Sequence, residues 1–268
     1  MEKEITYKSE TGASVKAFIA SHGEQGVKLP AIILVHEIFG LDNHIRDVAR
    51  RLAKEGYLVI APHLMYGELE QITDPALFAR LAPYFGKFRV IMNDPAQVKD
   101  FIAALPDADR KVFTTFTSVT SGALDTRFLA DLKGAFAYLT QNESVKPDRI
   151  ASMGFCFGGG MAGLLSVNIP EMAAHIIFYG KRPAADKIMN ITAPVLGLYG
   201  QLDQAITSQV PALAEDMKKA GKRFKYVIYD NAMHAFFNDT RAQVYNKEAA
   251  GKAWEEAKAF LREAIGNQ

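Results

Sequence analysis

The segment RIASMGFCFGGGMAGLL, residues 149–165, decides the fold of this 268-residue chain. It begins as an apolar run typical of a buried strand and continues directly into a small-residue stretch of helical type. Gly154 and Gly158 lie two residues before and after Cys156, the spacing of a sharp strand-to-helix turn that carries a nucleophile. Such a turn leaves no room for side chains at the two glycines. It exposes the sulfur at the carboxyl edge of a sheet, beside helix N–H groups that stabilise a thiolate or an oxyanion.

Cys156 is the only cysteine of the chain, and two readings of it compete. A lone cysteine is more often a small buried apolar residue than a nucleophile. The strand before it, the glycines around it and the helix after it favour the nucleophile. A single cysteine also excludes an internal disulfide, so the fold does not depend on an oxidising compartment.

A nucleotide-binding motif overlaps the same segment. Residues 158–163, GGGMAG, match the G-x-G-x-x-G pattern of dinucleotide-binding folds. In those folds the glycines begin directly after the strand, whereas here Cys156 occupies the place of the middle glycine. The next predicted strand also ends without an acidic residue for a ribose. We therefore expect no nucleotide and no other cofactor.

Short apolar runs alternate with helical patterns along the rest of the chain. Several runs are apolar almost throughout, as in parallel strands that are covered on both faces. This alternation predicts an α/β fold over residues 1–268: one domain with a doubly wound, mostly parallel sheet flanked by helices. Strands are expected at 16–20, 31–36, 57–62, 149–155, 175–180, 195–200 and 225–230, and helices at 43–55, 125–141, 158–167, 207–220 and 243–264.

The stretch from about residue 65 to 125 breaks this alternation. It contains two helical patterns but no convincing strand, and its Thr-rich part, residues 111–123, has no firm period. A segment this long is expected to be a helical, cap-like excursion over the carboxyl edge of the sheet. Its apolar side chains would then face a substrate; they are Phe78, Leu81, Tyr84 and Phe85.

An acid and a histidine follow Cys156 in the chain order that a triad on such a sheet requires. Asp203 comes just after the apolar run VLGLYG, and His234 lies in a loop after the next predicted strand. Each has a simpler interpretation, because Asp203 alone fits a helix cap and His234 alone fits a surface loop. Their order and their places at successive strand ends favour catalysis.

The charge balance excludes several classes of partner. Thirty-one basic and thirty acidic residues give a net charge of +1, without the basic surface that nucleic acid or an anionic membrane attracts. The N-terminal segment is charged and shows no secretory signal, so we expect a cytoplasmic protein, either a monomer or a homodimer. His36 and His63 are not spaced with other ligands, which predicts structural roles for them and no metal site.

Taken together, four motifs resemble those of the dienelactone hydrolase family of α/β-hydrolases. They are HEIFG at 36–40, GFCFGGG at 154–160, LYGQLDQ at 198–204 and MHAFFND at 233–239. The resemblance implies a cofactor-independent ester or lactone hydrolase with a Cys156–Asp203–His234 triad and a thioester acyl-enzyme. It further implies that Glu37 contacts and activates the cysteine, and that the N–H groups of Ile38 and Phe157 form the oxyanion hole.

The chain departs from the family pattern where the substrate binds. In the family, a serine and an arginine follow the catalytic histidine, whereas Ala235 and Asn238 occupy those positions here. We expect Tyr179, Phe236 and Asn238 to contact the substrate. Because an amide cannot neutralise a carboxylate, neutral short-chain esters should be used at least as well as an anionic lactone. A non-catalytic binder of small molecules remains the alternative. A compensating cation is expected among Arg80, Arg89, Lys181, Arg182 and Arg241.

Overall fold

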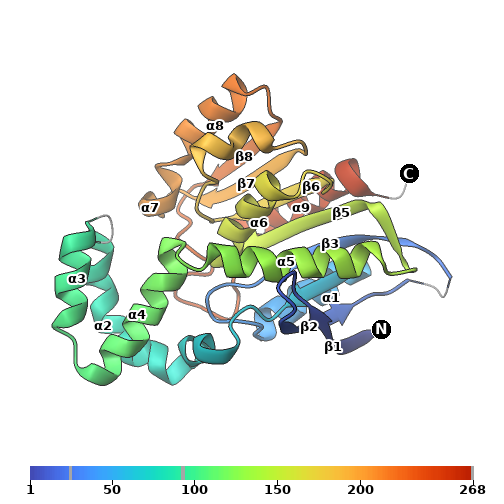
Figure 1. Ribbon diagram of the computed structural model, residues 1–268. Coiled ribbons are helices and arrows are strands. Elements are labelled where there is room, and N and C mark those ends of the chain that lie inside the picture. Colours follow the sequence, from blue (N-terminus) through green and yellow to red (C-terminus); the bar gives the residue numbers. More distant parts are fainter. Residues whose placement is uncertain (24–25, 92–93, 267–268) are drawn as a thin grey trace.

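The computed structural model describes residues 1–23, 26–91 and 94–266, without the side chains of Pro75, Phe78, Arg89 and Pro95. Its centre is an eight-stranded sheet in the order β1-β2-β4-β3-β5-β6-β7-β8 (Figure 1). Six strands are parallel to one another: β3, β4, β5, β6, β7 and β8. Strands β1 and β2 lie antiparallel at one edge. The strands are β1 (Glu2–Lys8), β2 (Ser14–Ala20), β3 (Leu29–Val35), β4 (Leu58–Pro62), β5 (Val145–Phe155), β6 (Ala174–Phe178), β7 (Val195–Gly200) and β8 (Phe224–Tyr229). This architecture confirms the predicted doubly wound, mostly parallel sheet.

Helices cover both faces of the sheet and explain why its inner strands are apolar throughout. All residues of β3, β4 and β6 are buried, because side chains on either face meet a helix. One face packs against α1 (Asn43–Lys54) and α9 (Lys247–Ile265). The other packs against α5 (Asp125–Thr140), α6 (Phe157–Asn168) and α8 (Val210–Lys219), with the short α7 (Gln204–Thr207) preceding α8.

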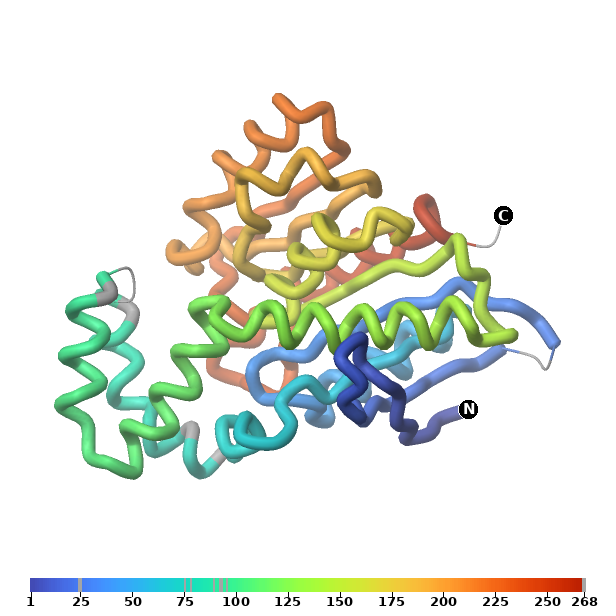
Figure 2. Tube along the Cα trace, in the orientation of Figure 1, coloured from blue at the N-terminus to red at the C-terminus, as the bar shows by residue number. Residues whose placement is uncertain are grey.

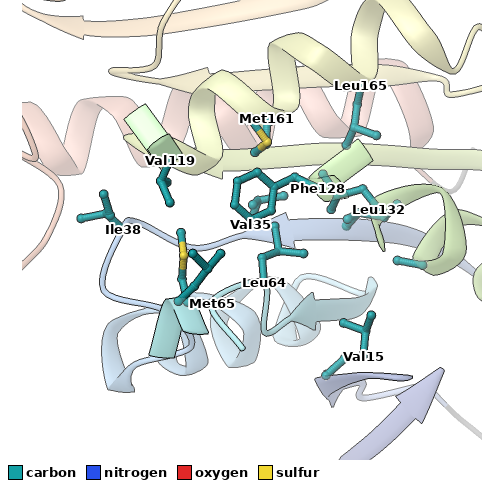
Figure 3. Packing of buried hydrophobic residues seen from close by; sticks show 14 of the residues in the cluster. Val15, Val35, Ile38, Leu64, Met65, Val119, Phe128, Leu132, Met161 and Leu165 are labelled. Carbon is teal, nitrogen blue, oxygen red and sulfur yellow. The ribbon is translucent and has the colours of Figure 1, made fainter. Parts of the chain in front are cut away.

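Four helical segments between β4 and α5 project beyond the carboxyl edge of the parallel strands, and we call them the excursion. They are the 3-10 helix η1 (Gly67–Thr73), α2 (Pro75–Ile91), α3 (Pro95–Ala103) and α4 (Asp107–Ser121). They extend to the side opposite the two chain termini (Figures 1 and 2). The end of α4 packs against the body of the molecule, where Val119 gathers with Ile38 and Met65 in one buried cluster (Figure 3).

The side chains expected to face a substrate instead build a small core inside the excursion. The ring of Phe113 is fully buried and lies 5.4 Å from that of Phe101, between centroids. Tyr84 packs edge-on against the same ring, and Phe85 lies 5.8 Å from it. Leu81 is buried as well. The prediction that Leu81, Tyr84 and Phe85 face the substrate was wrong, and the side chain of Phe78 lies outside the described part of the chain.

Two other local expectations differ from the structure. The charged N-terminus forms strand β1, paired with β2, although only Tyr7 of its seven residues is buried. The Thr-rich segment without a firm period is helical and belongs to α4. Its hydroxyl groups donate to backbone carbonyls one turn earlier, as Thr114 does to Arg110 and Ser118 does to Thr114. These bonds satisfy the hydroxyl groups within the helix, while packing of its buried side chains, Val112, Phe113 and Val119, holds the segment helical.

Candidate active site

Cys156 lies on a strained turn between β5 and α6. Its backbone angles are φ 55° and ψ −113°, a conformation that residues with a side chain rarely adopt. A Cβ atom added to Gly154 would lie 1.9 Å from the carbonyl oxygen of Gly158. One added to Gly158 would lie 2.2 Å from the carbonyl oxygen of Val35 at the end of β3. The two glycines therefore permit the close approach that the sequence motif predicts.

Asp203 and His234 are joined at the ends of β7 and β8. The Nδ1 atom of His234 lies 2.5 Å from Oδ2 of Asp203, and the carboxylate is almost completely buried. Asp203 occupies the N-cap position of α7, but its side chain caps no backbone N–H. The interpretation of Asp203 as a helix cap is thus wrong, because its carboxylate is directed to the histidine.

The His234 ring lies between Asp203 and Cys156. Burial opposes protonation of the ring, but the Cys156 sulfur and the hydrogen bonds to Asp203 and Cys156 outweigh it and raise its pKa well above the ordinary value. Because Nδ1 is engaged by Asp203, Nε2 remains for the sulfur. The structure thus brings the three residues together: His234 is hydrogen-bonded to Asp203, and its electrostatics are coupled to Cys156.

Two backbone N–H groups follow the ends of the paired strands β5 and β3. Phe157 is the first residue of α6, so its N–H has no partner within the helix. Ile38 follows the end of β3, and its N–H donates to no backbone acceptor among the described residues. Both side chains are held in place by packing: Ile38 is in the buried cluster, and the Phe157 ring packs against Phe128 with centroids 4.9 Å apart.

Glu37 is buried at the end of β3 and is held by a side chain from the loop after β8. Its Oε2 accepts a hydrogen bond of 2.6 Å from Nδ2 of Asn238. The other Asn238 atom, Oδ1, accepts from the N–H of Thr240 at 3.1 Å and from its hydroxyl at 2.6 Å. Asn238 is completely buried. It therefore faces Glu37 rather than a substrate, which corrects its expected role.

Thr240 is a residue that the sequence reasoning missed. The available signal was the Asn-x-Thr order at 238–240, since an asparagine oxygen often accepts from the backbone N–H two residues later.

Tyr179 and Phe236, the other expected substrate contacts, are also completely buried. The Tyr179 ring packs edge-on against His234, at 5.2 Å between centroids, and against Phe236 at 5.4 Å. Burial raises the pKa of the Tyr179 hydroxyl well above its usual range, and the nearby Glu37 and Cys156 raise it further. Tyr179 thus packs directly on His234, whereas Phe236 packs on Tyr179.

The structure also distinguishes among the candidate cations. Arg80 pairs with Asp109 inside the excursion, and Arg182 pairs with Asp216 of α8. Burial raises the pKa of Asp125 at the start of α5, and the exposed Lys181 offsets part of this effect. The side chain of Arg89 lies outside the described part of the chain.

Arg241 is the candidate that lies beside the site. Its guanidinium carbon is 5.0 Å from the centroid of the Phe39 ring, and its charge acts on the Tyr179 hydroxyl. Among the described residues, no carboxylate lies within ion-pair distance of Arg241.

His36 and His63 occupy structural positions in the fold. The His36 ring accepts a hydrogen bond from the N–H of Leu64 at Nε2, so its Nδ1 carries the proton and donates to the Glu37 carbonyl at 2.5 Å. Burial lowers its pKa to about 4, which keeps the ring neutral. The His36 ring also stacks on the ring of Phe157, the residue after Cys156. His63 lies at the end of β4, where burial lowers its pKa as well.

The described part of the chain offers neither a cluster of metal ligands nor a membrane-spanning helix. Within residues 1–23, 26–91 and 94–266, no group of three or more histidine, cysteine, aspartate or glutamate side chains could hold a metal ion. No helix in that part of the chain has the length and apolar character needed to cross a membrane.

A surface cleft of about 380 Å³ lies between η1, α4 and the start of α5. It is lined by Tyr66, Thr115 and Arg127 among others, and by none of the predicted site residues. The candidate site is therefore defined by the geometry around Cys156 and not by this cleft.

Comparison with known proteins gives consistent relatives. The model of the dienelactone hydrolase family matches residues 15–265. A protein of Saccharolobus solfataricus described as "Putative carboxymethylenebutenolidase" is 37% identical over 263 residues, which cover 98% of each chain. A crystal structure of a "Putative Dienelactone Hydrolase" from Klebsiella pneumoniae has a TM-score of 0.73 and 30% identity, again over 98% of each chain. A dienelactone hydrolase-like promiscuous phosphotriesterase from metagenomic libraries shares the fold, with a TM-score of 0.71 and 19% identity.

Proposed function

The chain belongs to the dienelactone hydrolase family and is a carboxylic ester or lactone hydrolase, and we propose that it acts through a Cys156–His234–Asp203 triad. The observation that carries this proposal is the hydrogen bond between Asp203 and His234, whose ring is electrostatically coupled to a cysteine on a strained turn. A serine in the same place would need the base to remove its proton. A cysteine needs less help, because a protonated histidine beside it stabilises the thiolate.

In the acylation step, the Cys156 sulfur attacks the carbonyl carbon of the ester. The carbonyl oxygen takes the negative charge and is met by the N–H groups of Ile38 and Phe157. The bond to the alkoxy oxygen then breaks, and that oxygen leaves with the proton from Nε2 of His234. The products of this step are a free alcohol and a thioester on Cys156; a lactone gives both on one molecule.

In the deacylation step, His234 takes a proton from a water molecule as the water oxygen attacks the thioester carbonyl. The C–S bond breaks, the carboxylic acid leaves, and the sulfur is restored beside the protonated ring. Asp203 holds the ring so that Nε2 faces the sulfur, and stabilises its positive charge in both steps. No cofactor is required by this sequence of steps.

Arg241 is the residue best placed to meet a substrate that carries a carboxylate. Its charge acts on the Tyr179 hydroxyl, and it has no carboxylate partner among the described side chains. A guanidinium can form two parallel hydrogen bonds to a carboxylate. Small-molecule esters and lactones, neutral or with one carboxylate, are the substrates that we propose.

The test is a panel of chromogenic esters and lactones of graded charge, assayed with the wild type, Cys156→Ala and Cys156→Ser. The alanine variant should stay folded and lose activity by roughly a thousandfold or more, because the attacking atom is gone. The serine variant should retain a trace. If Cys156→Ala hydrolyses the panel at the wild-type rate, the proposed mechanism is wrong. A folded wild type that binds these esters without cleaving any would favour the non-catalytic binder instead.

A further inference from the structure

The hydrogen bonds around Asn238 determine which way its amide faces. The backbone N–H of Thr240 is a donor and cannot accept, so the Asn238 atom that meets it at 3.1 Å must be the oxygen. The Thr240 hydroxyl donates to the same oxygen at 2.6 Å. The remaining Asn238 group, the NH2, therefore points at Glu37 and donates to Oε2.

This bond fixes the direction of the Glu37 carboxyl group. Glu37 is 1% exposed, so its hydrogen-bond partners in the protein, and not water, set that direction. Asn238 donates to Oε2, and the Tyr179 hydroxyl lies close enough to Glu37 for a side-chain hydrogen bond to contribute to its raised pKa. Rotation of the carboxyl group is thus limited by the amide.

The Glu37 carboxyl group lies in the neighbourhood of Cys156. Glu37 and Cys156 both act electrostatically on the Tyr179 hydroxyl, so the three side chains share one small region behind the strained turn. The other charged or titratable groups around that region are His234, which packs on Tyr179, and Arg241. His36 is adjacent in sequence, but its ring is bonded to the Glu37 carbonyl and to Leu64.

We propose that Asn238 is a positioning residue of this enzyme, which orients the Glu37 carboxyl group beside Cys156. It acts through Glu37 and does not touch the substrate. Thr240 is part of the same device, because its two hydrogen bonds prevent the amide from turning over. The proposal rests on the proposed function only in assigning Cys156 as the reacting group.

The consequence of a neutral partner is that the carboxyl group is held by the direction of a hydrogen bond. An arginine in this position would also act by its charge, whereas an amide can act only by donating its N–H. Loss of that donor should leave a buried carboxyl oxygen without its partner and let the group turn, which changes the surroundings of Cys156.

The test is the pH dependence of the rate at which iodoacetamide alkylates Cys156. Glu37→Gln, which replaces the carboxyl group by an amide of the same shape, shows how far Glu37 influences this profile. Asn238→Ala should change the rate at neutral pH in the same direction as Glu37→Gln, by about tenfold, because the carboxyl group is no longer held in place. Thr240→Ala, a milder change at an exposed residue, should change it in the same direction by less.

Asn142→Ala is the matched control. Asn142 accepts from the N–H of Ser144, as Asn238 does from the N–H two residues later, but it precedes β5 at the end of the strand opposite to Cys156, so its loss should leave the alkylation profile unchanged. The proposal is overturned if Asn238→Ala and Thr240→Ala keep the wild-type profile, or if Glu37→Gln has the same profile as the wild type. Alkylation reports on the thiol without ester turnover. A failure of this proposal is therefore separate from a failure of the mechanism, which the activity of Cys156→Ala measures.

Discussion

At the scale of single residues, Cys156 and Asn238 show what the sequence can and cannot establish. The G-x-Cys-x-G spacing predicted a strained turn because the close approach of backbone atoms is a local property, and the structure has that turn. The direction of the Asn238 side chain depends on Glu37, which is distant in sequence. No local pattern could reveal that this amide is buried and already paired.

The pKa of His234 offers a direct test of its contact with Cys156. Burial lowers this pKa, while the sulfur and the Asp203 carboxylate raise it, and the raising effects prevail. We expect the pKa of His234 to fall in Cys156→Ala and also in Asp203→Asn, as measured by NMR titration of the imidazole. An unchanged value in both variants would show that the ring is not held between these two groups.

Arg241 should affect substrates according to their charge. We expect Arg241→Gln to lower kcat/KM for a carboxylate lactone by about tenfold, the equivalent of one lost charged hydrogen bond. The neutral methyl ester should lose much less. Arg80→Gln is the control, because Arg80 is paired with Asp109 within the excursion. Equal losses on both substrates in Arg241→Gln would indicate a general structural role for this arginine.

At the scale of helices and strands, predictions from the sequence were most accurate where burial on two faces produces a continuous apolar run. Strands β3 to β7 belong to this class. The edge strand β1 was missed because its alternating charged residues face solvent, which resembles an irregular terminus. Helix α4 was missed because its threonines favour other conformations in isolation, while packing around Phe113 stabilises the helix here.

Two glycines inside helices should respond in opposite ways to alanine. Helix propensity alone predicts that both substitutions stabilise the protein, by about 0.5–1 kcal/mol each. Gly251 of α9 has open space where a Cβ would lie, so Gly251→Ala should raise the melting temperature. A Cβ on Gly134 of α5 would lie 2.3 Å from the carbonyl oxygen of Lys8, the last residue of β1. Gly134→Ala should therefore lower the melting temperature. Stabilisation by both substitutions would contradict the close packing of α5 on this edge.

At the scale of the whole molecule, the excursion is a separate layer over the edge that carries Cys156. Its helices α2 and α3 pack mainly on each other, on η1 and on α4. Figures 1 and 2 show it extending away from the sheet. We propose that it acts as a cap, since insertions at this edge can gate access to an active site. Its position could be expected from the length of the segment, whereas the inward packing of its aromatic rings could not.

The rate of hydrogen exchange should distinguish the excursion from the body of the molecule. The excursion has a small core of its own, so its amides in α2 and α3 should exchange faster than those of α5 and of the inner strands. Mass spectrometry of peptides from the native protein measures this difference. Equal protection of α2 and α5 would mean that the excursion opens only together with the whole fold.

The most direct test of the central claim, that the Cys156 sulfur is the nucleophile, is to trap the acyl group. The His234→Gln variant is mixed with p-nitrophenyl acetate, quenched with acid and analysed by peptide mass spectrometry. The activated ester should still acylate the thiol, while release by water should be slow without the base. The account predicts one acetyl group, on the peptide that contains Cys156, and none there in Cys156→Ala. Steady ester hydrolysis by the wild type, with the acetyl group on another residue or on none, would contradict it.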